Sequence, residues 1–532
     1  MSSDKKSMHN QINPRPIILF SRNYGSLLYV LFLSISLLGC TNQNERDKPN
    51  IILISVDDMG WSDLGCYGGE INTPNLDQLA QNGMRFRNFY NAGKCFPSRA
   101  ALLTGVYAHD SGYDQTHTNP IRNAVTLGEV LQEAGYATYY SGKHHGIDNP
   151  YDRGFQRFFG LIDGAFNHFN PGQQREGEPP PAQKRNDRQW GIDSIIYSPY
   201  TPKERDFYST DYFTNYALDY LEENKSNPFF LYLSYTAPHD PLMAWPEDIA
   251  KYKGKYNLGY DHIRQKRFEK QKSTGLLDDK VTLPEPTHRN WDSLSPKEQE
   301  YEASVMEVYA AMIDRIDQNI GRLLAKLEEI NASENTIILF VSDNGASAEV
   351  VDLKDDDDNA PLGSIARWTS LKKDWANVSN TPFRLYKNYN NEGGINSPLI
   401  AYWPKRIHPN TFTNYPGHFI DFMATFIEIS GATYPKSFKG EKITPLRGKS
   451  LVPVFKNPEM EREGPLFWEW RNSQAMRLQN WKIVRNDKNA PWDLYNMAND
   501  LTEINNIAGD HKEMVLKLND IYINWVLKYN QE

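Results

Sequence analysis

Two apolar runs that each end in acidic or amide residues constrain the fold of this chain more than any other feature. They span residues 50–60 (NIILISVDDMG) and 335–345 (NTIILFVSDNG). Short unbroken runs rich in Ile, Leu and Val are typical of strands that are buried on both faces of a sheet. Their polar ends are Asp57, Asp58, Asp343 and Asn344. In parallel sheets ligands gather beyond the carboxyl ends of the strands, so we expect these four side chains to meet there.

Helical segments alternate with further strands along most of the chain. Capping residues and apolar spacing predict helices at 75–83, 126–135, 296–330 and 417–431 and a strand at 397–404. Residues 136–145 are predicted as a strand that runs into a polar end, and residues 227–241 as a strand followed by a loop. This alternation is typical of an α/β fold, so we expect a large, mostly parallel mixed sheet with helices on both faces.

Four other stretches depart from the alternation. Residues 163–207 and 254–293 are rich in Pro or charge and are interpreted as inserts, and the acid run 352–359 (DLKDDDDN) as a solvated loop rather than a metal site. From about residue 461, short Trp-rich segments precede an amphipathic helix at about 510–528. They predict a small C-terminal α+β subdomain with a short antiparallel sheet.

The N-terminus predicts export with a lipid anchor. Arg15 and Arg22 precede the apolar run LLYVLFLSISLLG, which is short for a membrane span and long enough for a signal peptide. The ending LLGC resembles a bacterial lipoprotein box, in which cleavage precedes Cys40 and lipid is attached to it. A plain signal peptide or an uncleaved anchor is the alternative. We expect a lipoprotein in the periplasm or at the cell surface, touching the membrane only through its lipid.

Net charge and cysteine content limit the expected partners and the possible disulfides. The net charge is -9 and no basic block stands out, so nucleic acid is not an expected partner. Cys40, Cys66 and Cys95 are the three cysteines. If Cys40 carries lipid, Cys66 and Cys95 could pair as a disulfide in an exported protein. The alternative is that Cys95 is chemically special and Cys66 is a small apolar residue.

Cationic and proton-carrying side chains lie on the loops at the same predicted edge of the sheet. They are Arg99, Lys143, His145, His239, Lys387 and His418. The acidic strand ends offer the hard oxygen ligands that Ca²⁺ or Mg²⁺ prefers, whereas no His/Cys spacing resembles a zinc site. A cation with Arg, Lys and His forms a pocket for a tetrahedral dianion. The residues therefore indicate hydrolysis of a sulfate or phosphate ester.

Residues 95–105, CFPSRAALLTG, resemble the Cys-x-Pro-Ser-Arg-x-x-x-Leu-Thr-Gly signature of the formylglycine-dependent sulfatases, a branch of the alkaline phosphatase superfamily. The resemblance covers almost the whole mature chain. It includes NIILISVDDMGWSDLGCYG, GKHH, APHDP, FVSDNG, PFRLYKNYNNEGGINSP and WDLYNMANDLTEINNIA. The implied organisation is a signal peptide (1–39), a tether (40–49), a sulfatase catalytic domain (50–460) and a C-terminal subdomain (461–532).

The resemblance implies a modified residue and one metal ion. Cys95 would be oxidised to formylglycine by a maturation enzyme, which also explains why no disulfide partner is needed for Cys66. One Ca²⁺ would be bound by a set of oxygen ligands. That set is Asp57, Asp58, Asp343, Asn344 and the modified Cys95.

The resemblance also implies catalytic roles. Arg99 would steady the aldehyde hydrate, and Lys143, His239 and Lys387 would hold the sulfate and serve the leaving oxygen. One hydroxyl of the hydrate attacks sulfur. His145 would deprotonate the second hydroxyl, so that sulfate leaves by C–O cleavage and the aldehyde is regenerated.

Specificity is harder to transfer from the family. Asn396-Ser397-Pro398 and Trp468-Glu469-Trp470 depart from segments that many relatives share. Candidate substrate-binding residues are His168, His418, Arg471 and Arg477. We expect a sulfated oligosaccharide or polysaccharide fragment rather than a simple aryl sulfate. The alternatives are a phosphoester or phosphonate monoester hydrolase of the same superfamily and a non-catalytic lipoprotein that binds sulfated glycans.

Overall fold

The computed structural model describes residues 48–113, 119–223, 227–351, 353, 357 and 359–529. Residues 48–532 form one compact unit. The predicted signal peptide, the lipid site at Cys40 and most of the acid run 352–359 lie outside the described residues, so those interpretations stay predictions. Within the described ranges, no helix combines the length and apolar character needed to cross a membrane.

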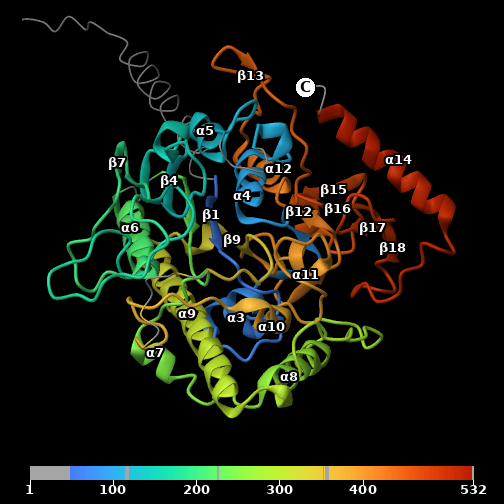
Figure 1. Ribbon diagram of the computed structural model, residues 1–532. Coiled ribbons are helices and arrows are strands. Elements are labelled where there is room, and N and C mark those ends of the chain that lie inside the picture. The colour runs from blue at the N-terminus through green and yellow to red at the C-terminus, as the bar shows by residue number, and fades with distance from the viewer. Residues whose placement is uncertain are drawn as a thin grey trace, which may run out of the picture. The chain divides into compact units, whose positions relative to one another are not determined.

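A ten-stranded mixed sheet runs through the described part of this unit in the order β11-β2-β10-β9-β1-β8-β4-β5-β6-β7 (Figure 1). Its strands are β1 (Asn50–Val56), β2 (Met84–Phe86), β4 (Ala137–Gly142), β5 (Arg157–Leu161), β6 (Trp190–Ile192), β7 (Ile195–Tyr197), β8 (Phe229–Ser234), β9 (Thr336–Ser342), β10 (Leu399–Tyr402) and β11 (Thr411–Thr413). The central strands β9, β1, β8, β4 and β5 are parallel. β10 is antiparallel to β9, and β6 and β7 continue the other edge as an antiparallel hairpin. The predicted fold class is confirmed.

The apolar run of β1 is buried on both faces of the sheet. Successive side chains of a strand point to opposite faces. Ile52 and Ile54 therefore join one hydrophobic core, whereas Ile51 and Leu53 join the other. Both cores need apolar side chains, which explains why the run is unbroken rather than alternating.

Helices cover both faces, as Figure 1 shows. One layer holds α3 (Pro74–Gln81), α6 (Ser209–Glu223), α7 (Pro246–Ala250), α8 (Gly259–Ser273), α9 (Pro296–Glu329) and α10 (Lys372–Ser379). The opposite layer holds α4 (Cys95–Thr104), α5 (Leu127–Glu133) and α12 (Asp421–Ser430). Short elements complete the connections: β3 (Phe89–Tyr90), α11 (Glu392–Ile395), β12 (Gly417–His418), β13 (Ser437–Phe438), β14 (Glu441–Lys442) and α13 (Val452–Lys456).

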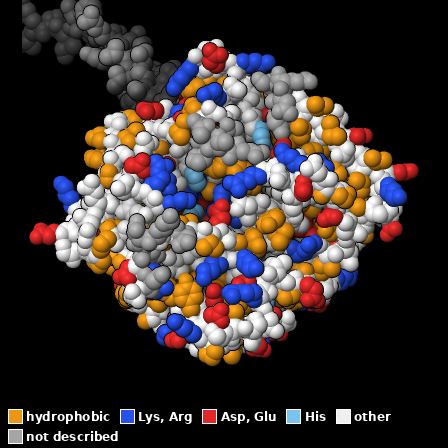
Figure 2. Space-filling view, viewed as in Figure 1, with side chains coloured by type: hydrophobic (Ala, Val, Ile, Leu, Met, Phe, Trp, Pro, Cys, Tyr) orange, Lys and Arg blue, Asp and Glu red, His pale blue; other side chains and the backbone are white. Residues whose placement is uncertain are grey.

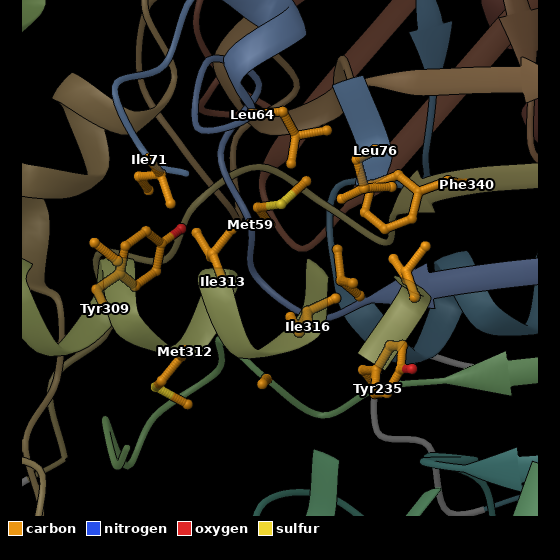
Figure 3. Close-up of a cluster of buried hydrophobic side chains, with 14 of the residues drawn as sticks. Met59, Leu64, Ile71, Leu76, Tyr235, Tyr309, Met312, Ile313, Ile316 and Phe340 are labelled. Atoms are coloured by element: carbon orange, nitrogen blue, oxygen red, sulfur yellow. The ribbon is translucent and has the colours of Figure 1, made fainter. Parts of the chain in front are cut away.

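The long helix α9 supports the loop that follows β1. In Figure 3, Tyr309 and Ile313 of α9 point toward Ile71 and Met59, and all four belong to the same buried cluster. The Tyr309 hydroxyl also donates a hydrogen bond of 3.2 Å to the carbonyl of Asp58. Packing and hydrogen bonding thus hold the loop that carries the predicted metal ligands.

The C-terminal segment forms the predicted antiparallel sheet, with β15 (Pro465–Trp470), β16 (Ser473–Leu478), β17 (Trp481–Arg485) and β18 (Asp493–Asn496) in that order. α14 (Lys512–Tyr529) packs against β16 and β17. Leu466 and Met476 share a hydrophobic cluster with Phe422 of α12. The domain boundary at residue 460 stays a prediction.

Some boundaries differ from the sequence expectations. The helix predicted from residue 417 begins at Asp421, because Gly417 and His418 pair with β3 and the His418 amide donates to the Asp421 carboxylate at 2.8 Å. The insert at 163–207 contributes β6 and β7 to the sheet edge, and the insert at 254–293 contains α8.

Candidate active site

The two polar strand ends predicted from the sequence meet at one edge of the sheet. β1 and β9 are adjacent and parallel, so the residues that follow them emerge side by side. Asn344 Nδ2 lies 2.6 Å from Asp58 Oδ1, and the Asp58 amide donates to Asp343 Oδ1 at 3.3 Å. Asp58 has a φ of 66°, in the left-handed region that non-glycine residues seldom adopt outside functional or tight-turn positions.

The donor set fits a hard divalent cation. Asp57 Oδ1 and Asn344 Oδ1 are buried, and neither accepts a hydrogen bond from a described residue. Buried oxygens without a donor are costly unless a cation or water satisfies them. Asp57, Asp58 and His239 also place possible ligand atoms within 4.8 Å of one another. We favour the oxygen set over His239 as ligands, because Ca²⁺ and Mg²⁺ select oxygen.

Burial and charge act in opposite directions on these carboxylates. Burial alone would raise the pKa of Asp57, but the positive charges of Lys143 and His239 hold that pKa below its usual value. Burial and the negative charge of Asp57 raise the pKa of Asp343. Two carboxylates so close together repel each other, and a bound cation relieves that repulsion.

Helix α4 places Cys95 and Arg99 at the same edge. Cys95 is the first residue of α4 and is 1% exposed, and Arg99 follows one helical turn later. Arg99 donates to Asp343 Oδ2 at 2.8 Å, to the Lys143 carbonyl at 2.8 Å and to the Ser234 hydroxyl. These partners hold the guanidinium in one orientation.

Lys143, Lys387 and His239 surround the carboxylates. Lys143 Nζ pairs with Asp57, and Lys387 Nζ lies 2.8 Å from Asp58. His239 Nε2 lies 3.5 Å from Asp58 Oδ2. Burial alone would lower the pKa of His239, but neighbouring carboxylates raise it above its usual value. Cations and proton donors therefore face one small volume.

The thiol of Cys95 lies within the electrostatic field of this group. Burial raises the pKa of the Cys95 thiol, although the charges of Lys387 and Lys143 oppose the shift. The structure has no disulfide at either described cysteine, since Cys66 and Cys95 are both free thiols. His145, with a φ of 60°, packs its ring 5.9 Å from the ring of Phe96, the residue after Cys95.

The four residues predicted to bind substrate differ in their exposure. His168 is fully buried behind His239, with Nε2 at 3.1 Å from the His239 carbonyl. His418 is fully buried against Trp468, and Arg477 is buried and bonded to the Tyr90 hydroxyl. These three side chains are not brought to an open surface. Arg471 is exposed and lines a cleft beside Lys387.

Three residues of the site were missed by sequence reasoning. Ser234 ends β8 and bonds Arg99, so the strand-end rule could have found it. Asp240 fixes His239, with 2.9 Å between Oδ1 and Nδ1, and it directly follows His239 in the chain. Glu349 pairs with Lys387 at 3.0 Å and with Lys94. No local signal marks Glu349, because its partners come from distant segments.

Two family models match the chain. The one described as Sulfatase matches residues 49–432. The one described as N-sulphoglucosamine sulphohydrolase, C-terminal, matches residues 384–521. Together they span the large sheet and the C-terminal antiparallel sheet.

Similar proteins and structures agree with these matches. An uncharacterised sulfatase of Schizosaccharomyces pombe is 34% identical over 92% of this chain and 95% of its own length. An arylsulfatase of Klebsiella aerogenes is 32% identical over 79% of this chain and 95% of its own. The crystal structure of Ps i-CgsB in complex with k-i-k-neocarrahexaose superposes with a TM-score of 0.66 at 26% identity, covering 90% of this chain and 92% of that one.

Proposed function

The chain belongs to the sulfatase family and is a sulfuric ester hydrolase, and from this premise we propose that it releases sulfate from a sulfated oligosaccharide or polysaccharide fragment with a formylglycine made from Cys95 and one bound Ca²⁺. One observation carries the proposal. Residue 95 opens a helix at the sheet edge where three carboxylates, an amide oxygen and four cationic or imidazole groups converge.

The ion would be held by the oxygens of the two strand ends, with the modified residue 95 as a further ligand. These residues are Asp57, Asp58, Asp343 and Asn344. When bound, Ca²⁺ supplies Lewis-acid stabilisation of negative charge at the reacting oxygens. The buried oxygens of Asp57 and Asn344 that accept no hydrogen bond from a described residue support this assignment.

The side chains around residue 95 divide the work of binding and proton transfer. Arg99 is fixed by its acceptors and orients residue 95. Lys143 and Lys387 offer ammonium groups to the sulfate oxygens, because both are buried at the site and positively charged. His239 donates a proton to the oxygen that leaves with the sugar, and Asp240 fixes the orientation of its ring.

The modified residue explains why a cysteine stands at position 95. As a hydrate, formylglycine offers one hydroxyl that loses its proton and attacks sulfur, so that the bond from sulfur to the sugar oxygen breaks. Deprotonation of the second hydroxyl then expels sulfate by C–O cleavage and restores the aldehyde. His145 accepts that second proton. Its ring is held against Phe96, next to residue 95, which supports the role.

Several observations support a sugar as the carrier of the sulfate. The similar Ps i-CgsB structure contains a neocarrahexaose, and the matched C-terminal model is named for a sulphoglucosamine sulphohydrolase. Both are properties of those proteins, and they favour a carbohydrate substrate here. The phosphoester and non-catalytic alternatives are less well supported, because the family model and the two relatives described above are all sulfatases.

The cellular setting is part of the proposal. We propose that residues 1–39 are removed, that Cys40 carries the lipid and that residues 40–49 tether the catalytic domain (50–460) and the C-terminal subdomain (461–532). The lipoprotein would lie in the periplasm or at the cell surface. A maturation enzyme of the exporting cell is the partner that oxidises Cys95.

Sulfate release from matched sulfated oligosaccharides and aryl sulfates tests the proposal, with Cys95→Ser and Cys66→Ser compared side by side. Cys66 is the matched control because it is the other free thiol of the described chain. We expect Cys95→Ser to abolish turnover, Cys66→Ser to retain it, and kcat/KM to be higher for the oligosaccharide. Equal activity of the two variants would contradict the mechanism, and a higher kcat/KM for the aryl sulfate would contradict the substrate class.

A further inference from the structure

A cleft of about 750 Å³ opens beside the proposed sulfate position. Lys387 and Glu349 line it. Glu349 also lines a small hollow with Asp58 and His239, so the cleft adjoins the reacting groups. Its volume lies within the range of small-molecule binding sites. The part of a substrate that remains after sulfate leaves would occupy this cleft.

Most of the charges in the cleft are already neutralised. Arg289 pairs with the buried Asp374 at 2.7 Å. Lys387 pairs with Glu349, and Lys372 lies 3.4 Å from a carboxylate of α9. These cations are committed to the fold or to the proposed sulfate site.

Two cations of the cleft have no anionic partner among the residues that the structure describes. Lys373, in the first turn of α10, and Arg471, in the turn between β15 and β16, are exposed, and their side chains form no hydrogen bond or ion pair with any described residue. Figure 2 shows Lys and Arg side chains gathered over the middle of the viewed face, including the region of α10. Unpaired cations at the mouth of a cleft attract an anionic group.

Contacts through Trp470 and Asn388 connect Arg471 to the proposed sulfate site. Its guanidinium lies 5.3 Å from the centroid of the Trp470 ring, and Trp470 is 2% exposed. Trp470 Nε1 donates to Asn388 Oδ1 at 2.9 Å, and Asn388 directly follows Lys387. The chain of contacts therefore fixes Arg471 relative to Lys387, which lets two anionic groups at a set spacing be recognised together.

We propose that Arg471 and Lys373 bind a second anionic substituent, a sulfate ester or a carboxylate, on the sugar that carries the scissile sulfate or on its neighbour. The inference rests on the proposed function and adds a substrate class to it: oligosaccharides with at least two negative groups. Arg471 contributes a planar fork of donors suited to either oxyanion. Tyr386 and Tyr389, which also line the cleft, offer apolar surface to the sugar rings.

Three oligosaccharides of one backbone test the proposal: one with the scissile sulfate alone, one with a second sulfate and one with a carboxylate. For the protein as it stands, we expect kcat/KM for either dianionic substrate to exceed that for the monosulfated one by about 10- to 100-fold, the effect of one charge-assisted hydrogen bond. The double variant Lys373→Ala/Arg471→Ala should lower this ratio to about one. Arg471→Lys should give an intermediate ratio, because it keeps the charge and loses the fork.

Lys266→Ala is the matched control, since Lys266 is an exposed lysine of α8 outside the cleft and should leave the ratio unchanged. Raising the salt concentration should reduce the ratio for the unaltered protein. A ratio near one in the unaltered protein, or a ratio that survives the double variant, would overturn the inference while leaving sulfatase activity in place. Release of no sulfate from any of the three substrates would count against the proposed function itself.

Discussion

Replacing Lys482 with methionine removes the cation that, among the described residues, forms direct ion pairs with two buried carboxylates, Glu392 and Glu503. Lys482 Nζ lies 2.6 Å from Glu392 Oε1 and 2.8 Å from Glu503 Oε1, and all three side chains are 0% exposed. Methionine has a similar length and no charge, so the variant leaves two buried carboxylates without a direct ion-pair partner. Breaking a buried ion pair in this way costs about 3–5 kcal/mol.

The cost should appear in the melting temperature. An unfolding entropy of about 2.1 cal/mol/K per residue gives roughly 1 kcal/mol/K for a unit of this length, so the expected loss is about 3–5 °C. The assay is thermal unfolding at one scan rate, compared with Lys488→Met. Lys488 pairs with Glu469 at 2.7 Å but is 41% exposed, and an exposed pair contributes only about 0–1 kcal/mol.

Activity should report on the same cluster. Glu392 begins α11, and its backbone amide donates to Glu503 at 3.0 Å. The loop that carries Lys387 leads into this helix, so loss of Lys482 should also lower kcat. A fall in melting temperature no larger than that of Lys488→Met would refute the reasoning that burial makes this pair costly to break.

Two further predictions concern pH and metal. Burial lowers the pKa of His418 to about 3, so the unfolded chain binds a proton at this residue more readily than the folded chain does. His418 therefore has no destabilising effect above about pH 6.5, and it lowers the free energy of unfolding by about 1.4 kcal/mol per pH unit as the pH falls from there toward 3. Between pH 6.5 and pH 5 this group should lower the free energy of unfolding, measured with urea, by about 2 kcal/mol, and His418→Asn should abolish that part of the decrease. If the free energy of unfolding falls in parallel with pH for variant and parent, the prediction is wrong. Dialysis against a chelator should lower both sulfate release and the melting temperature, and added Ca²⁺ should restore both. The variant Asp343→Ala should no longer respond to either treatment. A protein unaffected by chelation would show that Asp57, Asp58, Asp343 and Asn344 hold no functional metal.

The parts of the structure that follow from local sequence were predictable. Unbroken apolar runs identified β1 and β9, and parallel packing then required their polar ends to meet. The long helix α9 starts at Pro296 with Ser295 and Glu298 forming a capping box, a signal that is visible in the sequence.

The parts that depend on distant packing were not predictable. β10 runs antiparallel to β9, and nothing within residues 397–404 specifies that direction. His418 is buried beneath Trp468, which lies 50 positions further along the chain. Glu349 meets Lys387 only because two loops fold over one strand end. Periodicity and motif spacing carry no information about such contacts.

The mass of the peptide that contains residue 95, taken from protein exported by its own cells, tests the central claim most directly. The account predicts a peptide in which one oxygen replaces one sulfur and two hydrogens, together with an aldehyde that reacts with a hydrazide probe. An unaltered thiol at position 95 in a sample that releases sulfate would contradict it.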